Sequence, residues 1–366
     1  MNVAVCSSGD LFGGVEKFIL TLAVELKRCG AHHACVVLFS KGVLYEALRQ
    51  QDIETVLFDV PRYDFTVVGR LARFFRNQRI EVAHTHGYKA NLLCGLAAKL
   101  SGTRIVKTEH GAVEPLRTFD RMKVSANVGI DRLLSRYLID RIVYVSKDIQ
   151  QRNGKYYEGV LGEVIYNAIA HPPAPLSDRP AELDSRHFNV GVVGRLTPVK
   201  GHIYLLQALK ALPLPDLRLH VLGDGELRGE LEKFSQEHGV SARVRFLGFR
   251  ADADRFVRSL DAMVMPSLHE GFPYTMLEAG YWGVPLIASR VGGVQEAFHE
   301  PHECLFVEPR NVGQLKDAML RLYRDSALRR EIGQNARRKV MGHFLIDAMV
   351  TRYVSVYEES VSGRIQ

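Results

Sequence analysis

Short apolar runs alternate along this chain with segments whose apolar residues recur every three or four positions. In the first 170 residues the runs predict strands over 2–6, 34–39, 53–58, 80–84, 104–108, 141–145 and 163–166. The segment 15–28 predicts a helix, because its apolar residues fall on one face. Strands and helices in this alternation indicate a parallel sheet that is covered on both faces.

A second alternating series follows a proline-rich stretch. Its runs predict strands over 188–193, 217–222, 243–247, 262–265, 285–288 and 304–307, and the pattern is helical from 312 onward. The prolines between 172 and 180 cannot continue a helix or a central strand. We therefore expect an N-terminal domain over 1–170, a linker over 171–186, a second domain over 187–345 and a C-terminal helix over 346–366 that packs back on the first domain.

The expected fold is α/β, with two Rossmann-like doubly wound domains that face a central cleft. In sheets of this kind, ligands bind beyond the carboxyl ends of the strands. A length of 366 residues fits two domains, and 46% hydrophobic with 24% charged residues is typical of a soluble globular protein. Five cysteines without a C-x-x-C spacing favour a reduced cytosol over a disulfide framework or a zinc site.

The first residues and the charge of the chain indicate where the protein is located and which partners it could bind. The first residues enter an apolar strand without a basic region, which predicts no signal peptide, and no apolar stretch approaches the roughly 18 residues of a membrane span. We expect a cytoplasmic protein. Of the net charge of +7, residues 1–170 carry +6, which would attract an anionic membrane surface or a phosphorylated acceptor, and no nucleic acid is expected. Residues 117–141 mix basic and apolar positions, as either a membrane-facing helix or an ordinary packed helix would.

Two glutamates mark the stretch with the most candidate chemistry. Glu270 follows the predicted strand 262–265, and Glu278 lies in a helix that we expect to begin at Tyr274, after Pro273. The free N–H groups at that helix start favour an anion. Eight helical residues advance roughly 12 Å, whereas the carboxylates of a glycoside hydrolase lie about 5 to 9.5 Å apart. The spacing therefore favours two acids that bind different parts of one extended ligand.

A second loop carries cations and glycines. Arg195 and Lys200 follow the first strand of the second domain and are flanked by Gly194 and Gly201. An arginine fork, a lysine charge and close-approaching backbone N–H groups suit a diphosphate. Turns at 223–225 and 13–14 are compatible with a nucleotide or an anion, but equally with simple chain reversal.

Three histidines lie near predicted strand ends. His84 and His86 are two residues apart and share a face if they lie on a strand, and His110 follows the next strand. A metal pair, a contact with substrate and a buried hydrogen-bonded imidazole are all compatible with this pattern. No third ligand follows at a recognised spacing, so no metal site is expected.

Several motifs together resemble the family 4 retaining glycosyltransferases of the GT-B fold. They occur in the family's order over nearly the full length: Gly13-Gly14-Val15-Glu16, Gly194-Arg195 with Lys200-Gly201, Gly223-Asp224-Gly225, Phe246-Leu247-Gly248-Phe249, Glu270-Gly271-Phe272-Pro273 with Glu278, and Gly292-Gly293 with Glu296. The resemblance implies sugar transfer from a nucleotide diphosphate donor with retained anomeric configuration, without a metal and without a cofactor.

The resemblance also implies roles by position. Arg195 and Lys200 would hold the donor diphosphate, Glu270 the sugar hydroxyls and Glu278 the ribose, while His110 would touch the donor sugar near the reacting carbon. The remaining donor-side residues would be Gly13, Gly14, Gly223, Gly248, Phe249, Phe272, Pro273, Thr275 and Met276. On the acceptor side we expect Lys17, His84 and His86.

The expected function is transfer from a nucleotide sugar, with UDP favoured, to a saccharide or lipid-linked acceptor in bacterial surface polysaccharide or glycolipid assembly. A UDP-sugar epimerase of similar fold and a non-catalytic nucleotide-sugar binding protein remain alternatives. An NAD dehydrogenase is disfavoured, because no G-x-G-x-x-G follows the first strand. The departing phosphate is expected to accept the proton of the acceptor hydroxyl on the same face, in preference to covalent attack by Glu270.

Overall fold

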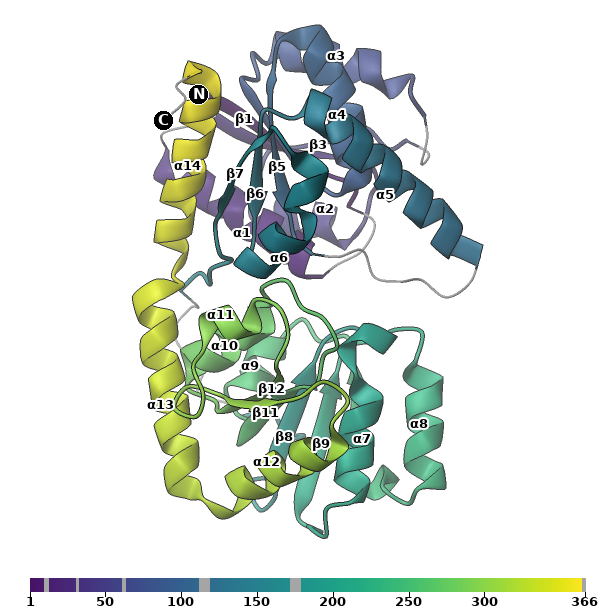
Figure 1. Cartoon of the computed structure of the whole chain (residues 1–366), viewed down its shortest axis with the longest axis vertical. Coiled ribbons are helices and arrows are strands. Elements are labelled where there is room, and N and C mark those ends of the chain that lie inside the picture. The colour runs from purple at the N-terminus through teal and green to yellow at the C-terminus, as the bar shows by residue number, and fades with distance from the viewer. Residues whose placement is uncertain (10–12, 31–32, 61–63, 112–118, 172–178, 364–366) are drawn as a thin grey trace. The chain divides into compact units, whose positions relative to one another are not determined.

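The computed structural model describes residues 1–9, 13–30, 33–60, 64–111, 119–171 and 179–363, with side chains left out over 119–127. The chain forms two compact units. The first comprises Met1–Ala170 together with Ile346–Gln366, and the second comprises His171–Leu345. Each unit is built on its own parallel sheet (Figure 1).

The sheet of the first unit has seven strands in the order β3-β2-β1-β4-β5-β6-β7. They are β1 (Asn2–Ser7), β2 (His33–Leu38), β3 (Thr55–Leu57), β4 (Val82–His86), β5 (Arg104–Glu109), β6 (Arg141–Tyr144) and β7 (Leu161–Val164). The central strands are buried almost throughout, as expected of a parallel sheet with helices on both faces. The strand order reverses between β1 and β4.

Helices connect these strands and cover both faces. They are α1 (Gly14–Cys29), α2 (Val43–Gln50), α3 (Val67–Asn77), α4 (Tyr88–Ser101), α5 (Phe119–Leu138), α6 (Lys147–Asn153) and the short η1 (Gly154–Tyr157). α3, α4 and α5 pack side by side, whereas α1 packs against α2 and against the last helix of the chain. The apolar stripe read over 15–28 is buried in α1, at Phe18, Ile19, Leu22 and Leu26 among others.

The last helix, α14 (Ile346–Ser362), is part of the first unit and contacts β4, β5 and α1. Figure 1 draws it in yellow beside the strands of that unit. Its fully buried Tyr353 and Tyr357 reach the sheet, where their hydroxyls bond Thr108 and His84. A salt bridge of 2.8 Å joins Arg28 of α1 to Asp347 at the helix start. The sheet face that α1 leaves open is therefore closed by a segment more than 200 residues away in sequence.

The second unit has a six-stranded parallel sheet in the order β10-β9-β8-β11-β12-β13. Its strands are β8 (Phe188–Val193), β9 (Leu217–Leu222), β10 (Val244–Gly248), β11 (Ala262–Met265), β12 (Leu286–Ser289) and β13 (Leu305–Val307). The order reverses between β8 and β11. That point is where open α/β sheets bind ligands.

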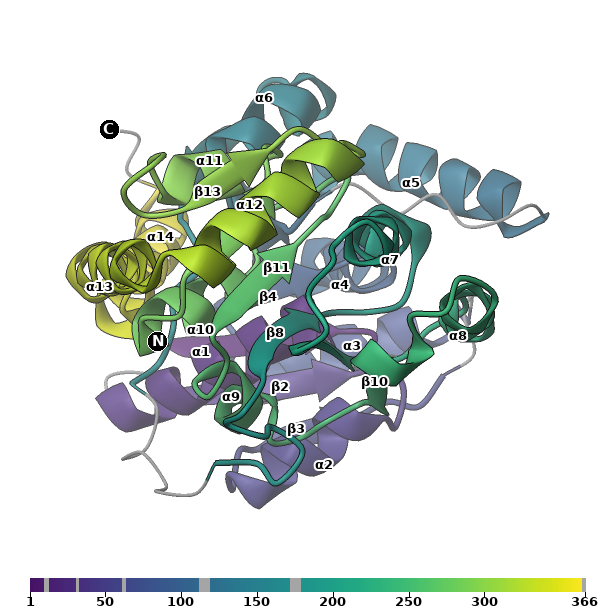
Figure 2. The same ribbon diagram turned by 90° about the horizontal axis from the view of Figure 1, so that it is seen from below.

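Helices again lie on both sides of this sheet. They are α7 (His202–Lys210), α8 (Arg228–Glu237), α9 (Ala253–Val257), α10 (Tyr274–Trp282), α11 (Val294–Ala297), α12 (Val312–Arg324) and α13 (Ser326–His343), with two single turns, η2 (Pro198–Lys200) and η3 (Ser241–Arg243). Figure 2 shows α7, α8 and α12 on one side of the strands and α9, α10 and α13 on the other. Leu205, Leu209 and Leu219 belong to the core that the first group of helices encloses.

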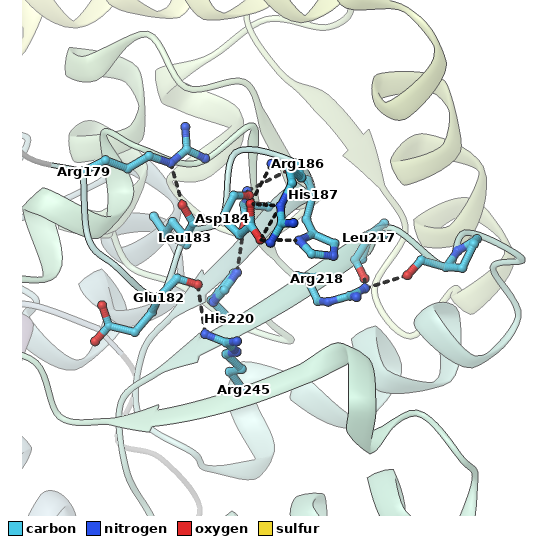
Figure 3. Close-up of polar contacts among 12 residues, drawn as sticks. Arg179, Glu182, Leu183, Asp184, Arg186, His187, Leu217, Arg218, His220 and Arg245 are labelled. Carbon is cyan, nitrogen blue, oxygen red and sulfur yellow. Dashed lines mark hydrogen bonds and ion pairs between the residues drawn. The ribbon is translucent and has the colours of Figure 1, made fainter.

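Residues 179–187 are fastened to the second sheet at the edge where its strands begin. Arg245 donates to the carbonyl of Glu182 at 3.1 Å, and Asn189 donates to the carbonyl of Asp184 at 2.9 Å. His220, in β9, bonds the Asn189 side chain in turn. Figure 3 shows His220 next to Glu182 and Arg245. Eight residues of the expected linker, 179–186, therefore belong to a segment that is held by the second unit, and the proline-rich part of the linker, 172–178, lies outside the described residues.

The strand predicted over 80–84 extends instead from Val82 to His86. Its neighbours continue on both sides, since His86 pairs with Ser7 of β1 and with Thr108 of β5. Polar residues at 84 to 86 disguised this end, because a strand buried on both faces usually reads as an apolar run.

Candidate functional site

The carboxyl edge of the second sheet gathers the cations and acids singled out in the sequence. The loop 194–201 leaves β8 and the loop 266–273 leaves β11, the two strands at which the order reverses. The first loop carries Arg195 and Lys200, and the second carries Glu270. Residues 70 positions apart thus meet at the place where a doubly wound sheet binds its ligand.

Lys200 and Glu270 bind each other directly. The Lys200 ammonium lies 2.8 Å from Oε1 and 2.9 Å from Oε2 of Glu270, and the Ser267 hydroxyl donates to Oε1 at 2.6 Å. The Glu270 side chain is 7% exposed and that of Lys200 is 23% exposed. The two residues expected to bind different parts of a ligand therefore act on one another, and the carboxylate is held in place by two donors.

Two close backbone approaches bring the loops together. Gly201 has φ 66°, and a Cβ there would lie 2.1 Å from the carbonyl oxygen of Pro266. Gly223 has φ 129°, and a Cβ there would lie 2.0 Å from the carbonyl oxygen of Gly194. The Gly223 N–H also donates to Gly248 at 2.7 Å. Only glycine fits at Gly201 and Gly223. The segments that follow β8, β9 and β11 and the last residue of β10 are therefore in direct backbone contact with one another.

The start of α10 differs in part from the expectation. Pro273 is its N-cap and Tyr274 its first residue, as predicted. The side chains of Phe272 and Met276 are buried at 2% and 0% exposure, and the Phe272 ring packs on Phe344 with centroids 5.3 Å apart. Phe272 and Met276 are therefore core residues. A ligand at this turn would bind the backbone N–H groups of the first helical turn that make no hydrogen bond within the helix.

Other donor-side candidates occupy the same edge in different environments. Glu278 is 7% exposed in α10, and Thr275, one turn earlier, lies 3.8 Å from the Met265 sulfur. Arg195 is exposed directly after Gly194. Phe249 is 60% exposed beyond the end of β10, where Gly248 has φ 69°. An exposed aromatic ring that follows a glycine is suited to stacking with a planar group such as a base.

In the first unit, the expected anion site lies at the start of α1, beside the strand reversal. Gly13 is the N-cap, and its N–H donates to the Glu16 side chain at 2.9 Å. That N–H is therefore not free for a phosphate, whereas Gly14 is exposed and a Cβ there would meet nothing within 4 Å. Packing alone does not require glycine at position 14. Lys17 lies three positions after Gly14 and is partly exposed.

The expected acceptor contact of His84 is not supported by its position. His84 has no exposed surface, and its two ring nitrogens bond the Thr108 hydroxyl and the Tyr357 hydroxyl, each at 2.7 Å. Burial lowers its pKa to about 3, so the ring is neutral. Of the readings left open by the sequence, the buried hydrogen-bonded imidazole fits this residue.

His86 and His110 form a pair beside it. Nδ1 of His86 lies 2.9 Å from Nε2 of His110, and the Phe18 ring packs edge-on or tilted against both. Burial lowers the pKa of His110 to about 3 and that of His86 well below its usual range. His86 is 1% exposed, whereas His110 is partly exposed. Of the pair, His110 is the one that can face a ligand.

Two family models match this chain in succession. "Glycosyltransferase Family 4" matches residues 12–171, and "Glycosyl transferases group 1" matches residues 177–339. The chain belongs to the family 4 glycosyltransferases. The order of the two models along this glycosyltransferase agrees with its two units, and both units contain residues that the sequence motifs singled out.

Named relatives and solved structures agree with this family. The glycosyltransferase is 25% identical over 314 residues to the UDP-Gal:alpha-D-GlcNAc-diphosphoundecaprenol alpha-1,3-galactosyltransferase of Escherichia coli, covering 80% of this chain and 79% of the relative. It is also 25% identical to the N-acetyl-alpha-D-glucosaminyl L-malate synthase of Bacillus anthracis, covering 82% and 80%. The crystal structure of Anabaena HepE in complex with UDP-glucose superposes with a TM-score of 0.86 at 22% identity, over 98% of this chain and 100% of that one. The fold of the glycosyltransferase is therefore GT-B.

A buried ionic network in the first unit was not anticipated from the sequence. The Lys107 ammonium lies 2.6 Å from Asp131 of α5 and 2.7 Å from the Tyr157 hydroxyl, and the Lys107 and Asp131 side chains are 3% and 8% exposed. Asn91 of α4 also bonds Asp131, and Tyr157 donates to Glu109 at 2.8 Å. A lysine in the middle of an apolar strand was the signal that could have revealed it. The network holds α5 and the residue before His110 in place.

The helices and the His, Cys, Asp and Glu side chains of the described residues bear on membrane and metal binding. No helix among them combines the length and the apolar character that crossing a membrane requires. Nor do the described residues contain a group of three or more His, Cys, Asp and Glu side chains that could hold a metal ion. In the segment 117–141, Ile130, Leu133 and Tyr137 of α5 are exposed. The side chains of residues 117–127 lie outside the described residues.

Proposed function

We propose that this glycosyltransferase moves a sugar from a UDP-sugar to a hydroxyl of a saccharide or lipid-linked saccharide, with retention of anomeric configuration and without a metal. The observation that carries the proposal is the ion pair of Lys200 with Glu270 at the strand reversal of the second unit, where the loop that carries Lys200 also carries Arg195. Two comparisons support the donor and the acceptor class. The Escherichia coli relative is named for UDP-Gal and a diphosphoundecaprenol-linked sugar, and Anabaena HepE was solved with UDP-glucose.

In this proposal the cationic side chains bind the diphosphate and the carboxylates bind hydroxyl groups. Arg195 and Lys200 bind the diphosphate, Glu270 the sugar hydroxyls and Glu278 the ribose, while Phe249 stacks on the base. As the bond between the anomeric carbon and the β-phosphate oxygen breaks, its electron pair moves onto the departing UDP. Cations that are already in place there stabilise the charge as it develops. Backbone N–H groups at the start of α10 add to this field.

The acceptor reacts on the same face as the leaving group. Its hydroxyl oxygen forms the new bond to the anomeric carbon, and its proton passes to the departing phosphate oxygen. This step needs no protein nucleophile, so the retained configuration does not depend on Glu270 forming a covalent bond. In this proposal His110, which is neutral and partly exposed, contacts the donor sugar.

A cytoplasmic, peripheral position at the membrane completes the proposal, with a role in bacterial surface polysaccharide or glycolipid assembly. On α5, the exposed Ile130, Leu133 and Tyr137 follow one another at helical spacing, and Arg136 is exposed beside them. Such a stripe suits shallow insertion between anionic headgroups. Sedimentation with vesicles of anionic lipid should fall when Leu133 and Tyr137 are both changed to Ser, whereas transfer to a soluble acceptor should persist. Equal binding of the variant to these vesicles would remove α5 from the proposal.

The decisive test of the activity is transfer from a panel of UDP-sugars in the presence of EDTA, with the anomeric configuration of the product read by NMR. Lys200→Ala and Arg195→Ala should each lower kcat at least tenfold. Lys210→Ala, which removes an exposed lysine at the far end of α7, is the control and should leave kcat unchanged. A UDP-sugar that changes configuration without any acceptor would favour an epimerase instead, and an inverted product would exclude retention.

A further inference from the structure

His86 and His110, the two neutral histidines in contact in the first unit, share one hydrogen bond, and each ring carries one N–H proton. Each neutral imidazole carries its proton on one nitrogen only. The bond between Nδ1 of His86 and Nε2 of His110 therefore couples the two tautomers. Either His86 donates and His110 keeps its proton on Nδ1, or His110 donates and His86 keeps its proton on Nε2.

The surroundings of His86 distinguish the two arrangements. Its Nε2 is buried and has no hydrogen-bond partner among the described residues. The rings next to it are Phe18, with centroids 5.2 Å apart, and His84, with centroids 4.2 Å apart. Both nitrogens of His84 are already bonded to Thr108 and Tyr357. A proton on Nε2 of His86 would be a buried N–H without an acceptor, and such groups are rarer in proteins than acceptors without a donor.

We propose that His86 is a positioning residue for His110. It donates from Nδ1 to Nε2 of His110 and so keeps the proton of His110 on Nδ1. Among the described residues no group bonds this Nδ1, and the ring is partly exposed. His110 then presents a neutral hydrogen-bond donor to the donor sugar. This inference rests on the proposed function for its effect on turnover, but the tautomer of His110 does not depend on that function.

The tautomer is read directly by NMR. In protein labelled with ¹⁵N-histidine, two-bond ¹⁵N–¹H correlations distinguish a proton on Nδ1 from one on Nε2, and the missing signals of His110→Ala assign the ring. We expect His110 to carry its proton on Nδ1. In His86→Phe the preference should be lost. In His86→Asn it should be kept, because the Asn amide can still donate. His220→Phe, at an equally buried histidine of the second unit, is the matched control and should leave His110 unchanged.

Turnover separates positioning from packing. His86→Phe should lower kcat about tenfold, the effect of misdirecting one hydrogen bond, whereas His86→Asn should restore most of it. In a His110→Ala background, His86→Phe should have no further effect, since it acts through His110. His86→Phe also leaves Nε2 of His110 without its described partner, so its melting temperature should fall, and kcat is compared well below that temperature to separate lost stability from lost positioning.

Three results would overturn the inference. They are a proton on Nε2 of His110 in the natural sequence, an unchanged His110 tautomer in His86→Phe, and an equal loss of turnover from His86→Phe with or without His110. If no UDP-sugar supports transfer, the proposed function fails, while the NMR spectra still decide the role of His86.

Discussion

The ammonium of Lys200 lies 2.8 Å and 2.9 Å from the two carboxylate oxygens of Glu270 and spans the point where the second sheet reverses its strand order. An ammonium has three donors, and two of them are directed at this carboxylate. A diphosphate that binds Lys200 must share these donors or displace them. The pair therefore sets part of the affinity of the site.

Removing the Glu270 charge should tighten UDP binding while it slows transfer. In Glu270→Gln, Lys200 no longer has a competing carboxylate, so the Kd for UDP should fall about threefold to tenfold, a modest gain because the Lys200 side chain is partly exposed. The kcat should fall, since Gln replaces the acceptor for the sugar hydroxyls. Titration calorimetry with UDP measures the first effect.

Two further variants control this prediction. Glu278→Gln removes the other buried carboxylate of the segment and should weaken UDP binding. In a Lys200→Ala background, Glu270→Gln should no longer tighten binding, because the cation that it releases is absent. Weaker UDP binding by Glu270→Gln alone would contradict the idea of a competing pair.

The contact between Tyr357 and His84 should stabilise the first unit. Tyr357→Phe removes the hydroxyl that bonds Nδ1 of His84 at 2.7 Å and leaves a buried nitrogen without a partner. We expect the free energy of unfolding to fall by about 1 to 3 kcal/mol. Ser355→Ala, on the exposed side of the same helix, should change it by less than about 0.5 kcal/mol. Urea unfolding followed by circular dichroism tests both, and equal losses would argue against a role for this hydrogen bond.

Sequence patterns located most elements, because apolar runs of four to six residues are strong signals for buried strands. The strand 188–193 and the start of α10 at Tyr274 were predicted at the observed residues. Strand order was not predicted, and the contact of Lys200 with Glu270 depends on it, since only the pairing of β8 with β11 brings the two loops together. Spacing alone cannot supply a pairing between residues 70 positions apart.

Side-chain direction was the other limit of the sequence. The position of Met276 in the first turn of α10 was correct, but its direction, into the core, depends on packing. Alternation placed His84 and His86 on one face of a strand. It could not show that α14 covers His84, because that helix lies more than 260 residues further along the chain. The roles assigned to Arg195 and Glu278 stay predictions.

The buried pair of Lys107 and Asp131 should tolerate joint replacement better than single replacement. Lys107→Met leaves Asp131 buried beside Asn91 without its cation, and we expect a loss of about 3 to 5 kcal/mol in the free energy of unfolding. Lys107→Met combined with Asp131→Leu removes both charges and should recover much of this loss. Chemical denaturation of the two single variants and the double variant measures the coupling, and additive losses would show that the two charges act independently.

Buried histidines should make the protein less stable as the pH falls below about 6.5. Burial lowers the pKa of His84 and His110 to about 3 and of His202 and His220 to about 4. Above about pH 6.5 both the folded and the unfolded chain hold these rings neutral. Below it the unfolded chain binds protons that the folded chain excludes, so each ring lowers the free energy of unfolding by up to about 1.4 kcal/mol per pH unit until its folded pKa is reached. Urea unfolding at pH 7.5, 6.0 and 5.0 should show this slope. His220→Gln should reduce this pH dependence by the contribution of one proton. Changing the exposed His299 to Gln should leave it unaltered. If His220→Gln does not change the pH dependence, other groups cause the acid sensitivity.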